Sequence, residues 1–112
     1  MAESSPEIID GWVEACAADS IDSEDVERFD HGDRTFAIYR SADDEYFATD
    51  GLCTHQQVHL SGGLVMGDLI ECPKHNGLFN YKTGEVKGRP ACVNLKTYPV
   101  RVVNGKVYVD LG

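Results

Sequence analysis

Short runs of strand-forming residues follow one another along the first half of the chain, with turn-forming residues between the runs, and the first run alternates between apolar and polar residues. The runs cover residues 11–16, 25–30, 35–40 and 46–50. Alternation with a period of two is typical of a strand that buries one face, and successive strand-forming runs separated by turns predict β-hairpins. Between them, apolar residues are too sparse for a long helix, and we expect only one short turn near Ala18–Ile21.

From Gly51 the pattern changes to a long irregular stretch that holds most of the cysteines and histidines. Within it, residues 68–72 predict a strand and residues 78–86 a hairpin that turns at Lys82–Gly84. Residues 97–111 form two alternating runs around the dipeptide Asn104-Gly105, the strongest short hairpin signal in the chain. Short strands with regular turns predict an all-β fold, a small antiparallel sandwich or barrel.

The length of 112 residues corresponds to one domain. We expect its base to comprise about 1–50 and 93–112. The irregular insert, about 51–92, would then sit at one end of the base.

The net charge of −9 argues against nucleic acid and anionic membranes as partners. Residues 1–50 carry 15 acids and 3 bases, a balance of −12, whereas residues 51–112 carry 4 acids and 7 bases, a balance of +3. No apolar run reaches the roughly 18 residues of a membrane span. The acidic start "MAESSPEIID" also lacks the pattern of a signal peptide, so we expect a cytoplasmic protein with reduced thiols.

Two cysteines and two histidines stand in a regular arrangement. The pattern is Cys53-x-His55, then 16 residues, then Cys72-x-x-His75, so each half offers one thiolate and one imidazole. Without an export signal, metal binding or catalysis is a better explanation for cysteines than disulfides. The other two cysteines, Cys16 and Cys92, are expected to be small buried apolar residues.

Three chemistries use these residue types. Zinc accepts two cysteines and two histidines, but finger-type sites usually group the cysteines and the histidines separately, often with a helix. A catalytic cysteine–histidine pair would leave the second half of the pattern unexplained, although Asn76 could orient such a pair. A [2Fe–2S] cluster with two cysteines on one iron and two histidines on the other uses all four residues. In that hypothesis, Gly51, Gly62, Gly63 and Gly77 give the two loops backbone freedom.

The segments "CTH" and "CPKHNG" resemble the Rieske signature. The resemblance extends to "LCTHQQVHLSGG", "LFNYKTGEVKGRPA" and "LKTYPVRVVNGKVYV", and so covers about residues 35–112. It is closest to the soluble Rieske-type [2Fe–2S] ferredoxins of bacterial ring-hydroxylating dioxygenase systems. It implies one cluster per chain, held by Cys53 and Cys72 on the inner iron and by His55 and His75 on the outer iron.

Respiratory members of this family differ at four positions. They carry a further cysteine in each loop, where this chain has Val58 and Lys74, so that disulfide is not expected here. They also direct a serine and a tyrosine hydroxyl at the cluster, where this chain has Gly77 and Phe79. Fewer hydrogen bonds to sulfur lower a cluster's potential, so we expect a value near the bottom of the Rieske range, roughly −150 mV.

The sequence shows no other catalytic equipment. It lacks a G-x-G-x-x-G motif for a nicotinamide or flavin. The spare His31 and His59 are expected on distant segments, unlike the ligands of a mononuclear iron oxygenase. We therefore expect a one-electron carrier and not an enzyme.

The resemblance implies partners as well. Electrons would come from a NAD(P)H-dependent flavin reductase and pass to a terminal Rieske non-haem iron oxygenase of aromatic catabolism. We expect a monomer whose docking face includes Gln56, Gln57, Lys74, Asn76 and Pro90. The alternative is a permanently bound Rieske-like small subunit of a reductase such as assimilatory nitrite reductase.

Overall fold

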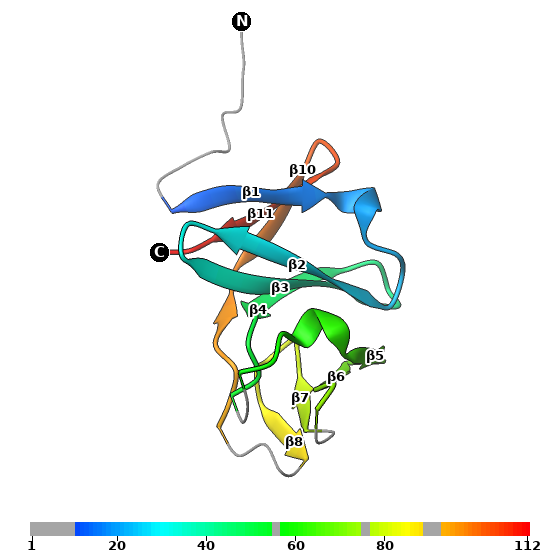
Figure 1. The fold of residues 1–112 in the computed structure, drawn as a ribbon. Helices are drawn as coiled ribbons and strands as arrows, with labels where there is room; N and C mark the ends of the chain where they lie inside the picture. The colour runs from blue at the N-terminus through cyan, green and yellow to red at the C-terminus, as the bar shows by residue number, and fades with distance from the viewer. Residues whose placement is uncertain (1–10, 55–56, 75–76, 89–92) are drawn as a thin grey trace, which may run out of the picture.

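The computed structural model describes residues 11–54, 57–74, 77–88 and 93–112, which form three antiparallel sheets stacked one upon another (Figure 1). The terminal sheet has the order β1 (Trp12–Ala17), β11 (Lys106–Asp110), β10 (Val100–Val103). The central sheet has the order β2 (Asp25–His31), β3 (Arg34–Arg40), β4 (Tyr46–Asp50), β9 (Thr97–Tyr98). The small sheet has the order β5 (Leu64–Met66), β6 (Leu69–Glu71), β7 (Leu78–Asn80), β8 (Val86–Gly88). Two short 3₁₀ helices, η1 (Ala18–Ser20) and η2 (Leu60–Gly62), complete the described elements.

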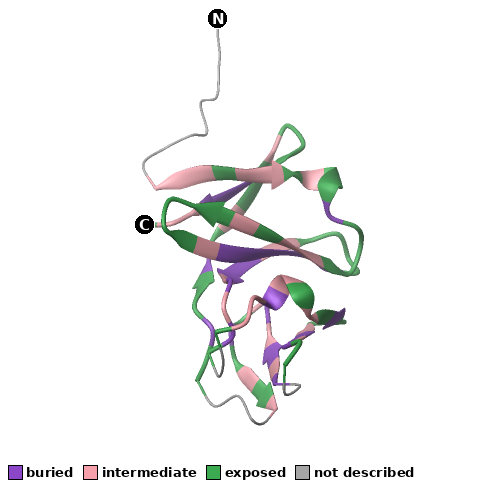
Figure 2. Cartoon of the chain, viewed as in Figure 1, coloured by how far each residue is buried: buried purple, intermediate pink, exposed green. Residues whose placement is uncertain are grey.

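Strand β3 lies between two hydrophobic cores. Phe36 and Ile38 pack toward the terminal sheet, with Val107 and Val109 of β11. Ala37 and Tyr39 point to the opposite face, where they pack with residues of the small sheet and of the loops around it. Figure 2 shows the resulting buried stretch along β3. A strand covered on both faces reads as a continuous apolar run, which explains why "FAIY" does not alternate.

The second of these cores, between the central and small sheets, is built around aromatic rings. Tyr39 and Tyr81 stack with their ring centroids 4.6 Å apart. The buried hydroxyls are paired, since the Tyr39 hydroxyl lies 2.9 Å from Oγ1 of Thr49 and the Tyr81 hydroxyl donates to the carbonyl of Gly67. Cys53 and Cys72 belong to this same core.

The hairpins predicted from the sequence are present. β2–β3, β3–β4, β7–β8 and β10–β11 all pair as antiparallel neighbours. Asn104 and Gly105 adopt φ values of 52° and 75°, the left-handed backbone that a two-residue hairpin turn requires. The short turn expected near Ala18–Ile21 is η1. The all-β prediction is therefore confirmed.

Two features differ from the prediction. β1 closes the terminal sheet by pairing with β11, the last strand of the chain, which local pattern alone did not predict. The stretch after Gly51 is also more regular than expected, because β5 to β8 form a sheet of their own. Their strands have only three residues each, too few to show a clear alternation. Among the described residues, no helix is long and apolar enough to cross a membrane.

Candidate metal centre

Cys53 and Cys72 come together from two separate loops. Cys53 follows the end of β4, and Cys72 directly follows β6. Their exposed fractions are 1% and 0%, they belong to the same hydrophobic core, and the Cys53 thiol is close enough to raise the pKa of Cys72. The structure thus brings the two predicted cysteine ligands into one core, and their role as ligands stays a prediction. His55, His75 and Cys92 lie outside the described residues.

The two loops close in the same way. The amide of Cys53 donates to the carbonyl of Val58 at 2.9 Å, and the amide of Cys72 donates to the carbonyl of Gly77 at 2.7 Å. Each cysteine thus begins a loop that returns to it five residues later. His55 and His75 fall within these two closed segments of the sequence. These two backbone hydrogen bonds were not predicted from the sequence, because no residue type in the loops indicates them.

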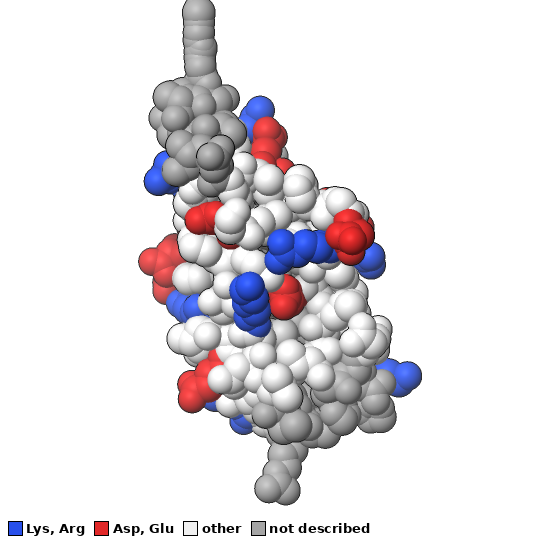
Figure 3. Space-filling model, turned by 90° about the vertical axis from the view of Figure 1, so that its left-hand side faces the viewer, with Lys and Arg blue, Asp and Glu red and all other residues white. Residues whose placement is uncertain are grey.

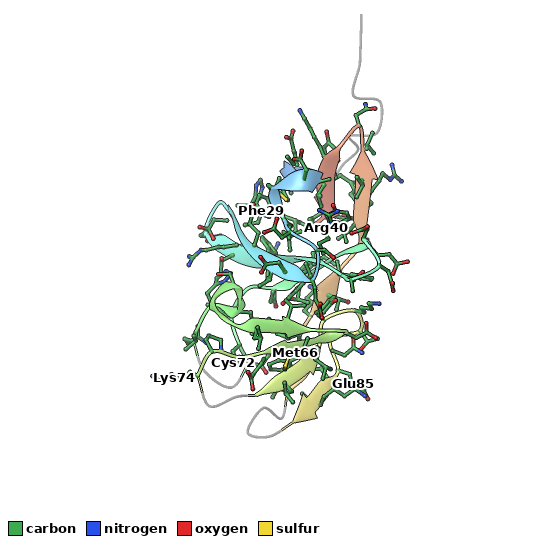
Figure 4. All side chains as sticks on the ribbon, turned by 90° about the vertical axis from the view of Figure 1, so that its right-hand side faces the viewer. Phe29, Arg40, Met66, Cys72, Lys74 and Glu85 are labelled. Atoms are coloured by element: carbon green, nitrogen blue, oxygen red, sulfur yellow. The ribbon has the colours of Figure 1, made fainter. Side chains whose placement is uncertain are left out.

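The loops are held from the side as well as at their bases. Oγ1 of Thr54 donates to the carbonyl of Val93 at 2.6 Å, which ties the first loop to the chain segment before β9. A Cβ atom placed on Gly62 would lie 3.7 Å from Cγ of Pro73, so η2 touches the second loop. Pro73 and Lys74 are exposed. Figure 4 shows Lys74 at the outer edge of this end, with Cys72 further inside.

Two glycines allow close packing beneath the loops, which is a different role from the backbone freedom predicted for them. Gly51 and Gly63 do not have positive φ values. A Cβ atom on Gly51 would lie 2.5 Å from Nε2 of His59, and one on Gly63 would collide with the carbonyl oxygen of Glu71. The reason for glycine at these positions is therefore the absence of a side chain.

The surroundings of Cys72 favour the neutral thiol in the absence of a metal. Burial raises the pKa of Cys72, and the neighbouring Cys53 thiol adds to the increase, while the backbone at Lys74 acts in the opposite direction. A bound cation reverses this balance because it stabilises the thiolate directly. Both cysteines are free of disulfides. A pair of buried, adjacent, unoxidised thiols at the bases of two loops fits the sulfur ligands of one iron.

Comparison with known families decides between the chemistries left open by the sequence. Residues 11–99 match the model of the Rieske [2Fe–2S] domain. This chain belongs to the Rieske [2Fe–2S] domain family. The match contains β1 to β9, and thus the whole of the central and small sheets and both loops. Membership of this family implies a Rieske [2Fe–2S] cluster as the cofactor, and not zinc.

Curated relatives of this chain include ferredoxin components of dioxygenase systems. The ferredoxin component of a naphthalene 1,2-dioxygenase system from Pseudomonas putida is 40% identical over 89% of this chain and 95% of its own length. The biphenyl dioxygenase ferredoxin subunit of Pseudomonas sp. (strain KKS102) is 39% identical over 88% of this chain and 91% of its own length. Both relatives are thus matched almost end to end.

Solved structures of ferredoxins have the same fold as this chain. The complex of reduced oxygenase and oxidised ferredoxin of carbazole 1,9a-dioxygenase contains a chain that superposes with a TM-score of 0.84 at 37% identity, covering 91% of this chain and 94% of that one. A ferredoxin of Sphingomonas yanoikuyae B1 gives a TM-score of 0.84 at 35% identity, covering 89% and 98%. The prediction of a Rieske ferredoxin resemblance is confirmed.

The positions that distinguish respiratory Rieske proteins are apolar or exposed in this chain. Val58 is half-buried and Lys74 is exposed. Gly77 is buried, and Phe79 is fully buried in the core that contains Cys53 and Cys72. The ring of Phe79 thus occupies this core without a hydroxyl group.

The two spare histidines are closer in the fold than expected. Nε2 of His59 lies 2.8 Å from Oγ1 of Thr35, and Thr35 pairs with Asp30, the residue before His31. The expectation of distant segments was wrong, because no local pattern in the sequence indicates that η2 packs against the β2–β3 hairpin. Among the described residues, no three histidine, cysteine or carboxylate side chains form a group that could hold a metal ion.

A cavity of about 390 Å³ lies beside the first loop. Its lining includes Arg34, Asp50, Cys53, Thr54 and Gln57. Figure 3 shows Lys and Arg interspersed with Asp and Glu over one face of the molecule, with a mainly uncharged surface next to the loop end. Of the residues expected at the docking face, Gln57 and Lys74 are exposed, whereas Gln56, Asn76 and Pro90 lie outside the described residues.

Proposed function

We propose that this protein is a soluble carrier of single electrons in a multicomponent oxygenase system, not an enzyme in its own right. The observation that carries the proposal is the buried pair of Cys53 and Cys72 at the closed bases of two loops. Near end-to-end similarity to ferredoxin components of dioxygenase systems supports it.

The proposed cluster ligands are Cys53, His55, Cys72 and His75. Cys53 and Cys72 would hold the inner iron, since both sulfurs lie in the core. His55 and His75 would hold the outer iron, since each follows its cysteine inside a loop closed by a backbone hydrogen bond. When bound, the cluster supplies a site that accepts and releases one electron. The protein residues keep water from the sulfurs and fix the positions of the loops.

A low potential is proposed from the residues near the sulfurs. Phe79 in the core and Gly77 at the base of the second loop have no side-chain donor. Hydrogen bonds to sulfur raise a cluster's potential, so their absence favours a value of roughly −150 mV. Such a carrier would accept electrons readily from a reduced flavin.

The loop end is the proposed docking face. Thr54, Gln57, Val93 and Asn94 are exposed there and uncharged, with Lys74 as a nearby positive charge. A small surface of this kind suits transient redox contacts. Its proposed partners are a NAD(P)H-dependent flavin reductase and a terminal Rieske oxygenase. The proposal includes a monomeric protein in the cytoplasm, in aromatic catabolism, with no nucleic-acid or membrane partner.

The whole chain, 1–112, is proposed to form one domain, with a base of about 1–50 and 93–112 and a cluster-binding insert of about 51–92. The alternative of a bound nitrite reductase subunit has weaker support. A putative NADH-dependent nitrite reductase small subunit of Mycobacterium tuberculosis superposes with a TM-score of 0.79, but at 22% identity this likeness concerns the fold alone.

The test is the reduction potential of the purified protein, with its iron content and the EPR spectrum of its reduced form. We expect two irons per chain, a Rieske-type spectrum and a potential well below zero. A potential of several hundred millivolts would contradict the oxygenase role, because a reductase–oxygenase chain needs a low-potential carrier. A protein without iron would contradict the whole proposal.

A further inference from the structure

His59 is held by hydrogen bonds on both sides of its ring. Nδ1 accepts from the amide of Ser61 at 3.0 Å, so this nitrogen carries no proton. The neutral ring therefore has its proton on Nε2, which faces Oγ1 of Thr35 at 2.8 Å. Two different parts of the chain, η2 and the β2–β3 hairpin, thus fix one tautomer of His59.

The hydrogen bonds continue beyond Thr35 in one direction. The hydroxyl of Thr35 donates to Oδ1 of Asp30 at 2.6 Å, so Oγ1 has a lone pair free to accept from His59. Asp30 also accepts from Nε of Arg28, at 3.0 and 3.2 Å. From His59 through Thr35 and Asp30 to Arg28, each hydrogen-bond donor therefore faces an acceptor.

The position of His59 links this series to the first loop. His59 follows Val58, whose carbonyl closes the loop at Cys53, and it forms an isolated bridge with Leu52. Gly51, beneath the ring, donates its amide to the carbonyl of Thr35 at 2.9 Å and accepts from the amide of Leu60 at 2.8 Å. The ring thus crosses the base of the loop and attaches it to the central sheet.

We propose that His59 is a positioning residue that clamps the first cluster loop to the β2–β3 hairpin through Thr35 and Asp30, and that the clamp opens when the ring is protonated. The inference rests on the proposed ligand set. A protonated ring would place an N–H at Nδ1 against the N–H of Ser61, so one anchor of the loop would be lost. The cluster would then be released more readily at acid pH.

The electrostatic surroundings agree with this geometry. Burial and the charge of Arg28 lower the pKa of His59 from its ordinary 6.5, whereas Asp30 and a backbone hydrogen bond at Phe36 raise it less. The folded protein therefore favours the neutral ring. Because the unfolded state binds the proton more readily, stability is full above about pH 6.5 and falls as the pH drops through the lower folded pKa.

The experiment measures the rate at which the purified holoprotein loses iron to a chelator between pH 5.5 and 7.5. Thr35→Val removes the hydroxyl that joins His59 to Asp30, and Thr35→Ser keeps it. We expect release from Thr35→Val to be about threefold to tenfold faster at pH 7.5, the range for one lost hydrogen bond, with Thr35→Ser close to wild type. Equal rates for both variants would overturn the clamp.

His59→Asn keeps an acceptor for the amide of Ser61 but cannot be protonated. We expect its ratio of rates at pH 5.5 and 7.5 to fall at least about threefold below the wild-type ratio. The matched control is His31→Gln, because His31 is exposed on the same hairpin, and it should keep the wild-type ratio. A wild-type ratio in His59→Asn would overturn the switch while leaving the proposed function intact. Absence of iron from the wild-type protein would overturn both.

Discussion

Cys53 and Cys72 lie with their thiols adjacent in one core, although one follows a strand of the central sheet and the other a strand of the small sheet. The amide of each donates to a carbonyl five residues further on. The two loops therefore start from neighbouring cysteines, and a change at either cysteine should affect the binding of iron by both loops.

The first prediction concerns the sulfur pair. Cys72→Ser should reduce bound iron to less than about a tenth of the wild-type content, because a buried hydroxyl is a poor ligand for iron compared with a thiolate. Cys16→Ser is the control, since Cys16 is a free, half-buried cysteine that packs against the other core. Iron per chain and visible absorbance measure both. Full iron content in Cys72→Ser would remove Cys72 from the ligand set.

Neighbouring glycines provide the second prediction. Gly63→Ala should destabilise the protein by about 2 kcal/mol or more, because the new Cβ would meet the carbonyl of Glu71, and main chain cannot move aside easily. In Gly62→Ala the new Cβ would meet only Cγ and Cβ of Pro73, at 3.7 and 3.9 Å, so its effect should stay within about 1 kcal/mol. Urea unfolding compares the two variants. Equal urea concentrations at half unfolding for the two variants would show that the main chain at Glu71 moves to accommodate the new Cβ.

The third prediction concerns alkaline pH. Burial, followed by the hydrogen bond with Asp50, raises the pKa of Tyr98 to about 12. In the unfolded chain this hydroxyl ionises near 10, so the folded state holds more protons between pH 10 and 12, and stability falls as the pH rises through this range. Tyr98→Phe should reduce the slope of unfolding free energy against pH by up to about 1.4 kcal/mol per unit. Unfolding curves at three alkaline pH values test this. An unchanged slope would mean that Tyr98 ionises alike in both states.

The fourth prediction tests the docking face. Lys74→Glu should slow reduction by the proposed flavin reductase about threefold or more at low salt, with iron content unchanged, because a charge at a contact mainly alters association. The difference should shrink at high salt as the charges are screened. Lys106→Glu is the control, since Lys106 begins β11 in the terminal sheet, at the opposite end of the molecule from the two loops (Figure 1). If both variants behave alike at low salt, the reductase binds elsewhere.

Much of the fold could be predicted from the sequence because it depends on local signals. The turn at Asn104-Gly105 and the alternating strands beside it are recognisable from neighbouring residues alone. The pairing of β1 with β11 depends on contacts between the two ends of the chain, which no local pattern encodes. The small sheet also went unrecognised as a sheet, because three-residue strands give too short a pattern.

The candidate ligands were proposed from their spacing in the sequence. The residues that hold the two loops in place were not predicted. Cys53 and Cys72 stood out because each is followed closely by a histidine, and the structure brings the two cysteines into one core. Their role as cluster ligands stays a prediction. The role of His59 could not be predicted, because it depends on Thr35, which comes from a strand far away in the sequence. Gly51 and Gly63 were recognised as necessary for the wrong reason, since a close approach between segments leaves no trace in the sequence beyond the glycine itself.

Strand β3 contributes alternate side chains to both cores, Phe36 and Ile38 to one and Ala37 and Tyr39 to the other. The core that contains Cys53 and Cys72 and the core beneath the terminal sheet, where β1 pairs with β11, therefore share strand β3. Opening either layer exposes a face of that strand, so the domain should unfold cooperatively and the amides of β3 should be among the slowest to exchange with deuterium. A carrier built in this way keeps its loops on a scaffold that does not loosen independently of the rest of the molecule.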